Sequence, residues 1–293
     1  MEMCVRFSLA AVLLGAVGIS PQSAAAQDSL WIATGTWEGV SEETPIIRLV
    51  SDTAATISNA VIQRPAATES WLTVFNLDSV PHHWFMDGME GESIEILAYS
   101  ETEIALPALP QGTYCYGLAD ELGKRLGGRG MVQVGLTPEA NSGFPLFHWN
   151  LNDWSTPDMQ ALAAGVSLDP SSPYVPDRFT INERTYPATA EDAFAVVQLN
   201  MGDTCWIAIA NHGLMDHVLH FHGFHVTLLT STHHPERIGW SKDTVPVLRG
   251  EGLTVQLVAN QSGTYPVHDH NLIAVTNAGF YPGGMLTHIN VAP

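Results

Sequence analysis

Lysine is almost absent from this sequence, and positive charge is scarce. Lysine occurs only at Lys124 and Lys242. Lysine and arginine together account for 11 of 293 residues, against 30 aspartates and glutamates, so the formal net charge is -19. An acidic surface of this kind repels the phosphates of nucleic acids and of anionic lipids. We therefore expect no nucleic-acid partner and no binding to a membrane surface.

Cysteine is scarce as well, with three residues in the chain. Cys4 lies in an amino-terminal segment that reads as an export signal, so only Cys115 and Cys205 remain after its removal. Two cysteines far apart in the sequence do not form a disulfide framework, even in an exported protein. We expect both to be buried free thiols, since neither has histidines at the spacing of a metal site.

Beyond the amino terminus, no segment is apolar over a length that spans a bilayer. The terminus itself has a positive charge at Arg6, an apolar run over residues 7–19 and small residues at Ala24–Ala26. This order is typical of a secretory signal peptide. We predict a signal peptide over residues 1–26, cleavage before Gln27, and a periplasmic or secreted protein with no membrane contact after cleavage.

Short β-rich segments separated by Gly, Pro and Asn turns fill most of the remaining chain and predict an all-β fold of β-sandwiches. A central segment differs, because it is rich in proline, has little strand pattern and allows one short helix from Pro157 to Ala164. We read it as a linker packed on the surface. The predicted order is an N-terminal domain over residues 27–137, this linker over 138–177 and a C-terminal domain over 178–293.

The two strand-rich blocks share one plan. Gly112-Thr-Tyr in the first block matches Gly263-Thr-Tyr in the second, and Gly130-Met matches Gly284-Met. In each block a strand ending near histidines precedes the Gly-Thr-Tyr strand. This pattern indicates an internal duplication of one sandwich.

The placement of the 13 histidines carries the strongest chemical signal. Side chains two residues apart in a strand share a face, so His220 and His222 point together, and so do His268 and His270. Two such pairs on neighbouring strands bring four imidazoles within reach of one metal site. Imidazole suits copper and zinc. The alternative for each histidine is a structural role in the core or at the surface.

At this point the motifs resemble those of the multicopper oxidases. The resemblance covers residues 178–293 well and residues 70–137 more loosely. It is carried by His217-Val-Leu-His220-Phe-His222-Gly223, which is similar to the family motif H-P-x-H-L-H-G, and by the segments Phe179–Pro187, Asp243–Pro246 and Gly263–His270. The resemblance implies two cupredoxin-like Greek-key β-sandwich domains and bound copper. It also implies a homotrimer in which the cluster closes between neighbouring subunits.

The resemblance assigns a role to each histidine of these motifs. His217 matches the blue type 1 copper ligand and His220 the type 2 ligand. The type 3 ligands are matched by His222, His268 and His270. No other catalytic residue is assigned.

The type 1 ligands of the family are missing from this sequence. Asp269 stands where the family has the cysteine of its H-C-H motif, and Ala274 stands where it has a second histidine. A blue copper site needs a thiolate, two imidazoles and a weak axial ligand. We therefore predict a vacant type 1 pocket in which His217 and Asp269 contact each other directly.

The first domain has also lost ligands, and only His83 remains of the four expected there. His83 together with His220 would still make a type 2-like site. The sequence thus predicts an exported copper-binding protein that lacks blue copper, with zinc as an alternative ion. A metal-free scaffold for protein interactions and an oxidoreductase with unusual copper sites are the competing functions.

Overall fold

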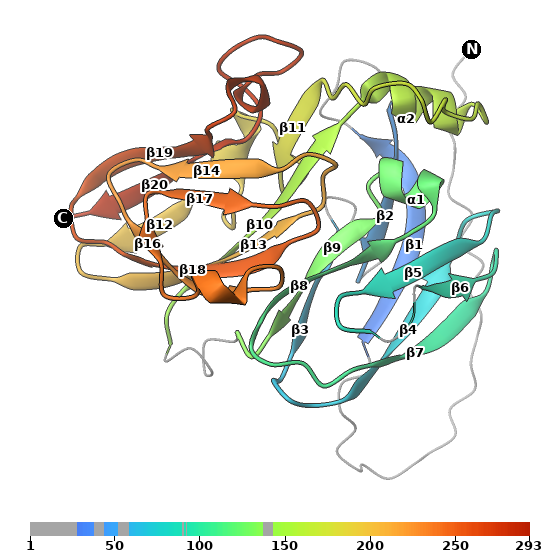
Figure 1. The fold of residues 1–293 in the computed structure, drawn as a ribbon, viewed down its shortest axis with the longest axis horizontal. Helices are drawn as coiled ribbons and strands as arrows, with labels where there is room; N and C mark the ends of the chain where they lie inside the picture. The colour runs from blue at the N-terminus through green and yellow to red at the C-terminus, as the bar shows by residue number, and fades with distance from the viewer. Residues whose placement is uncertain (1–27, 38–43, 52–58, 90, 92, 137–142) are drawn as a thin grey trace.

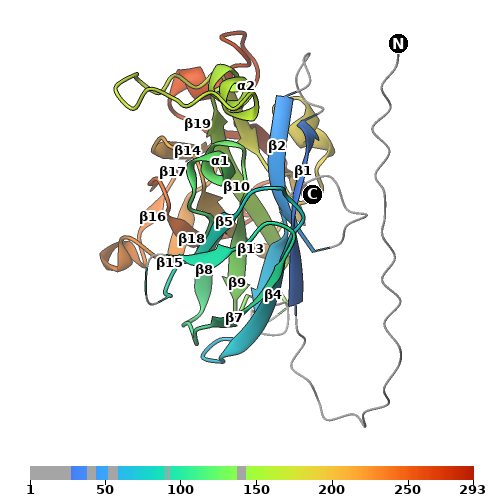
Figure 2. The same ribbon diagram turned by 90° about the vertical axis from the view of Figure 1, so that its right-hand side faces the viewer.

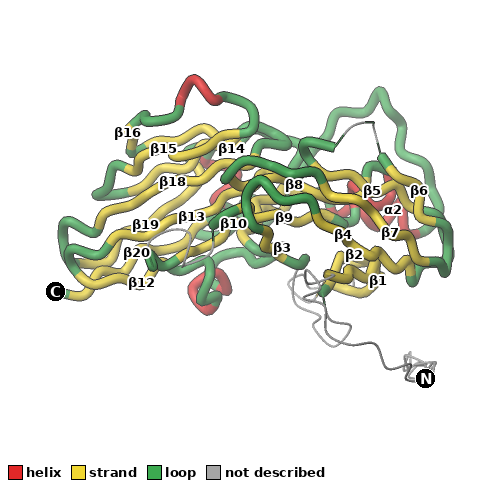
Figure 3. Tube along the Cα trace, turned by 90° about the horizontal axis from the view of Figure 1, so that it is seen from below, coloured by secondary structure: helices red, strands yellow, loops and turns green. Residues whose placement is uncertain are grey.

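The computed structural model describes residues 28–37, 44–51, 59–89, 91, 93–136 and 143–293. The expected signal peptide lies outside these residues. Two β-sandwiches stand side by side (Figures 1 and 3), in agreement with the all-β prediction. Among the described residues, two short α-helices, α1 (Glu121–Arg125) and α2 (Thr156–Ala163), contact each other at one end of the molecule (Figure 2).

The first sandwich consists of a four-stranded and a five-stranded sheet. In spatial order the four-stranded sheet contains β2 (Thr44–Val50), β1 (Asp28–Trp37), β4 (Ser70–Asn76) and β7 (Glu101–Leu106). The five-stranded sheet contains β3 (Val61–Arg64), β9 (Arg129–Val134), β8 (Gly112–Leu118), β5 (His82–Met86) and β6 (Ile94–Ile96).

The second sandwich consists of a six-stranded and a five-stranded sheet. The six-stranded sheet contains β11 (Arg178–Ile181), β10 (Leu146–Trp154), β13 (Thr204–Asn211), β18 (Gly252–Val258), β15 (Val226–Ser231) and β16 (Ser241–Lys242). The five-stranded sheet contains β12 (Val197–Asn200), β20 (Leu286–Ala292), β19 (Gly263–Asp269), β14 (His217–Phe221) and β17 (Thr244–Val247). Three short 3-10 helices lie between its strands, at Ala188–Glu191, Pro235–Arg237 and Leu272–Val275.

Apolar clusters fix the order of the four sheets. One large cluster fills the first sandwich and another fills the second. A smaller cluster joins the five-stranded sheet of the first sandwich to the six-stranded sheet of the second, through Cys115, Met131, Ala208 and Ala210. The five-stranded sheet of the second sandwich is therefore an outermost layer, with one face in the core and one face outward.

The segment expected to be a surface linker is in part a core strand. β10 runs parallel to β13 in the six-stranded sheet, and both Trp149 and Leu151 are fully buried. The prolines that suggested a linker flank this strand and do not interrupt it. The expected helix is present as α2, where Pro157 occupies the first turn and the Ser155 side chain accepts a hydrogen bond from the Asp158 amide.

A tight turn after β11 anchors the second sandwich on the first. Asn182 and Glu183 both have positive φ, at 52° and 62°. The Glu183 carboxylate is buried and accepts hydrogen bonds from the Arg48 side chain at 2.6 Å and from the Asn59 amide at 3.0 Å. Trp37 donates its indole N–H to the Glu183 carbonyl at 3.1 Å. This turn thus links the two sandwiches through polar contacts shielded from water.

Candidate metal centre

Strands β14 and β19 bring the predicted histidine pairs together. The two strands are antiparallel neighbours, and His220 lies directly opposite His268. On both strands the alternate residues, among them Leu219, Phe221 and Val267, are buried in the core of the second sandwich. The imidazoles therefore share the outward face of the outermost sheet, as the two-residue period of a strand requires.

Three imidazoles converge closely enough to bind one ion. One ring nitrogen from each of His220, His222 and His268 lies within 4.8 Å of the other two. The Nε2 atoms of His222 and His268 are 2.9 Å apart. Two nitrogens that share one metal at about 2.0–2.1 Å each are separated by about 3 Å, so this pair fits a metal edge. His270 is more exposed, and its ring centroid lies 5.6 Å from that of His220.

The protonation states of His268 and His222 also suit metal binding. His268 donates its Nδ1–H to the Asp269 carbonyl oxygen at 2.8 Å. A carbonyl only accepts hydrogen bonds, so in neutral His268 the lone pair is on Nε2, the atom that faces His222. Burial and the neighbouring His220 and His268 lower the pKa of His222, which favours its neutral form. Metals bind the neutral imidazole.

His83 does not join this cluster within one chain. It alternates on β5 with Trp84 and Met86, which are buried in the first core. Its side chain therefore lies on the face of that sheet that looks toward the second sandwich. The His220 side chain faces the opposite way, outward from the last layer. The expected pairing of His83 with His220 is thus not made inside a single molecule, because the layers of the second sandwich separate them.

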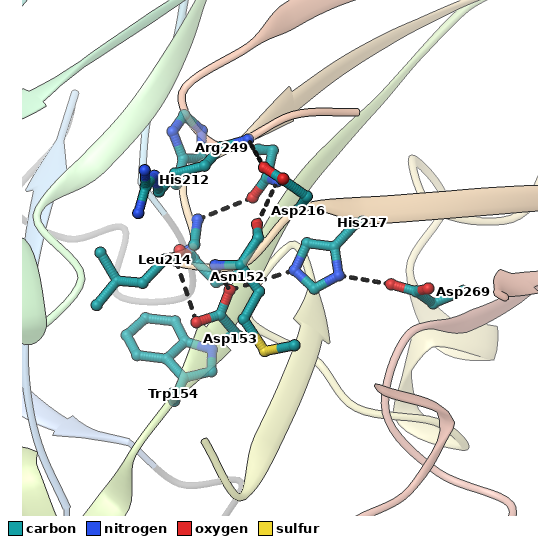
Figure 4. A network of polar contacts seen from close by, with 12 residues as sticks. Asn152, Asp153, Trp154, His212, Leu214, Asp216, His217, Arg249 and Asp269 are labelled. Atoms are coloured by element: carbon teal, nitrogen blue, oxygen red, sulfur yellow. Dashed lines mark hydrogen bonds and ion pairs between the residues drawn. The ribbon is translucent and has the colours of Figure 1, made fainter. Parts of the chain in front are cut away.

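His217 and Asp269 lie on the inner face of the same sheet, since both are fully buried and alternate with the outward histidines. Figure 4 shows their side chains pointing toward each other. The predicted contact between them is present, with His217 Nδ1 at 2.5 Å from the Asp269 carboxylate. The other ring nitrogen, Nε2, lies 3.2 Å from the Asp153 carboxylate. Burial lowers the pKa of His217, but the hydrogen bonds to Asp153 and Asp269 outweigh it and raise the pKa to about 9. His217 is therefore a buried imidazolium between two carboxylates at neutral pH.

Asp153 is the residue that the sequence interpretation missed. It lies at the end of β10, inside the segment taken for a linker, and its side chain is fully buried. Its carboxylate also accepts hydrogen bonds from the amides of Leu214 and Met215, at 3.1 and 3.0 Å. The available signal was a polar run, Asn150-Leu-Asn-Asp153, directly after the apolar part of a strand. Buried polar groups of this kind need partners.

The first sandwich repeats the arrangement around His217. His82 is the first residue of β5, as His217 is of β14, and it is also fully buried. Its ring nitrogens lie 3.2 Å from carboxylate oxygens of Asp120 and Asp78. Burial lowers the pKa of His82, but these carboxylates outweigh it and raise the pKa. This second carboxylate–imidazole–carboxylate chain supports the duplication inferred from the sequence.

Both cysteines of the described residues are free and buried, as expected. Cys115 lies in the apolar cluster between the two sandwiches, and Cys205 lies on β13 in the second core. Burial raises the pKa of Cys205 to about 12, and it raises the pKa of Cys115 as well. Both therefore carry protonated thiols at neutral pH. Protonated thiols do not ligate metals.

The family comparison agrees with this geometry. A family model described as multicopper oxidase matches residues 154–282. This segment is therefore similar to a multicopper oxidase domain. It contains β14 and β19, and so it includes all four histidines of the two pairs, together with His217 and Asp269. No curated protein matches the chain in sequence.

Solved structures share the fold of most of the chain. A blue copper oxidase from Nitrosomonas europaea is 20% identical over 90% of this chain and 85% of its own, with a TM-score of 0.76. A copper nitrite reductase from the same organism is 14% identical over 91% and 94%, with a TM-score of 0.67. A laccase from Botrytis aclada is 12% identical over 89% and 52%, with a TM-score of 0.69. The two sandwiches are therefore cupredoxin-like. Within the described residues, no helix is long and apolar enough to cross a membrane.

We predict that the His217 chain makes stability depend on pH in the alkaline range. The folded-state pKa is about 9, above the ordinary value of 6.5. A raised histidine pKa stabilises the fold fully below the unfolded pKa, and that contribution is lost as pH rises through the folded pKa. The free energy of unfolding, measured by urea titration, should therefore fall between pH 6.5 and about 9.

The matched control is His217→Gln, which keeps hydrogen-bonding groups but does not titrate. Its stability should be lower at neutral pH and should lack this alkaline decrease. An identical pH profile for the variant and the wild type would show that His217 is not the titrating group.

Proposed function

We propose that this chain is an exported copper-binding protein of the multicopper oxidase type that lacks a blue type 1 copper. His220, His222 and His268 hold the metal, with His270 beside them. The convergence of three imidazole nitrogens within 4.8 Å is the observation that carries the proposal. Zinc is the alternative ion for the same ligands, because imidazole suits both metals. The signal-like residues 1–26 support a periplasmic or secreted location.

The residues around His217 support the loss of type 1 copper. A blue site needs a cysteine thiolate beside its imidazoles. The position that would supply it is Asp269, whose carboxylate is already bonded to His217. Cys115 and Cys205 lie on other strands as protonated, buried thiols. The type 1 pocket in this proposal is filled by an ion pair.

Bound copper would supply one-electron redox chemistry at the outer face of the sheet. The chain contributes neutral imidazoles there, and the Asp269 carbonyl holds one of them in the tautomer that leaves Nε2 free. The rings are partly accessible to solvent. A small reductant or a protein that accepts copper would therefore reach the ligands without any opening of the core.

We predict that the purified protein binds Cu(II) or Zn(II) and that the histidine pairs are responsible. Metal content should fall by more than half in a His220→Ala, His268→Ala double variant, because two of three converging ligands are removed. The measurement is elemental analysis after loading and gel filtration. His234→Ala, an exchange at a histidine near the surface that pairs with Glu236, is the control and should keep the wild-type content. Equal metal content in the double variant and the wild type would contradict the assignment of these histidines as ligands. A wild type that retains no metal would favour the metal-free scaffold.

We also predict that the copper-loaded protein has no intense blue absorption and oxidises phenols only at background rate. Without a cysteine thiolate the charge-transfer band of a blue site has no donor. Visible absorption spectra of the copper-loaded protein and oxygen-dependent turnover of a phenol are the measurements. A strong blue band would mean that a cysteine reaches the metal and that the assignment of Asp269 is wrong.

The position of His83 supports assembly as a homotrimer. His83 lies on the first sandwich and cannot meet the cluster of its own chain. In a ring of identical subunits, a head-to-tail interface places the first sandwich of one copy against the second sandwich of the next. His83 would then complete the ligand set of a neighbouring subunit.

We predict a trimeric mass in solution, measured by light scattering coupled to gel filtration. His83→Ala should lower metal affinity in the trimer and leave the mass unchanged, because a single side chain adds little to an interface. A monomeric wild type would contradict this part of the proposal and would leave His83 without a role at the cluster.

A further inference from the structure

We propose that Asp153 is a positioning residue for the metal ligand His268, acting through His217 and Asp269. The inference rests on the proposed function, since it concerns the same cluster. It adds a residue that lies on a different sheet from the ligands and that makes no contact with them. The observation behind it is one continuous chain of hydrogen bonds from β10 to the outer face of β19. Figure 4 shows the buried part of this chain, from Asp153 through His217 to Asp269.

The first link is Asp269, whose polar groups are all engaged. Its carbonyl accepts the Nδ1–H of His268 at 2.8 Å, and its amide donates to the Met285 carbonyl at 3.1 Å. One carboxylate oxygen accepts the Asn271 amide at 2.7 Å, and the other is bonded to His217. A residue that is held through its amide, its carbonyl and its carboxylate has one orientation. The tautomer and direction of the His268 ring follow from that orientation.

The second link is His217, which has no freedom to turn. Carboxylates bind both of its ring nitrogens, at 2.5 Å for Asp269 and 3.2 Å for Asp153. The side chains of all three residues are fully shielded from solvent. Inside a dry core, an imidazolium that loses one carboxylate has no water to replace it. The ring would move to keep its charge satisfied, and Asp269 would move with it.

The third link fixes Asp153 to the frame of the molecule. Its carboxylate accepts the amides of Leu214 and Met215, and its carbonyl accepts the hydroxyl of Tyr174 at 2.9 Å. Asp153 also lines a crevice of water size where Lys124 of the first sandwich approaches β10. The outermost sheet is thereby tied, through a single chain of bonds, to the region where the two sandwiches meet.

The test is Asp153→Asn, which keeps the shape of the side chain and removes its charge. We expect the Kd of the cluster for Cu(II), measured by competition with a chelator, to weaken by about tenfold, as is typical when a residue behind a metal ligand is changed. We also expect the ¹⁵N signals of His268 in the metal-free protein to shift toward a mixture of tautomers. Glu183→Gln is the matched control, because it alters a buried carboxylate that contacts Arg48 and not the chain to His268. It should leave both readouts unchanged.

The outcomes separate this inference from the proposed function. If the wild type binds metal and Asp153→Asn binds it equally well with an unchanged His268 spectrum, the positioning role is wrong. If the wild type binds no metal, the proposed function fails, and the ¹⁵N spectrum of the metal-free protein still decides whether Asp153 fixes the His268 ring. Should Asp153→Asn fail to fold, His217→Gln breaks the same chain one bond closer to the ligand and is read in the same way.

Discussion

A charge inside a protein core must be balanced, and this requirement organises the second sandwich. His217 is enclosed on every side, and only the two carboxylates beside it make its charge tolerable. Satisfying it takes three strands: β14 supplies the imidazole, while β10 and β19 supply the carboxylates. The packing of two sheets and the orientation of the strand that carries His268 thus depend on one polar chain.

The same solution in the first sandwich shows that the requirement is general to this chain. His82 is held between Asp78 and Asp120 as His217 is held between its carboxylates. The loops that precede the two histidines also agree. Asn76 donates its side-chain N–H to the carbonyl of Val80, and Asn211 donates in the same way to Met215, four residues on in each case. Two copies of one structural unit have kept the same buried polar frame while their outward faces diverged.

The parts of the site that follow from strand periodicity were predictable from the sequence. His220, His222, His268 and His270 are spaced by two, so a shared face follows once the strands are placed. Asp269 lies between two outward residues, so its inward side chain and its contact with His217 follow from the same rule. The positions of these side chains depend only on the alternation of residues along a strand and on the pairing of β14 with β19.

Asp153 and His83 were not predictable in this way, because their positions depend on how separate elements pack. Proline content suggested a linker at residues 138–177, yet β10 is buried there because it pairs with β13. His83 was expected to form a site with His220, and the stacking order of the sheets keeps the two apart within one chain. The spacing of residues in the sequence does not determine which face of a sheet packs against the other domain. Only the apolar cluster around Cys115 and Ala208 reveals it.

The stacking order has a consequence for how such a protein can change over generations. The imidazole cluster lies on the outward face of the last layer, while the apolar clusters that hold the fold lie between the layers. Ligands can therefore be gained or lost one substitution at a time with little effect on folding. The side chains in the inner pockets lack this freedom. Removing one of them leaves a buried charge without a partner or leaves a cavity in the core. The outer face is then free to acquire new chemistry, while the inner polar chains are constrained to persist.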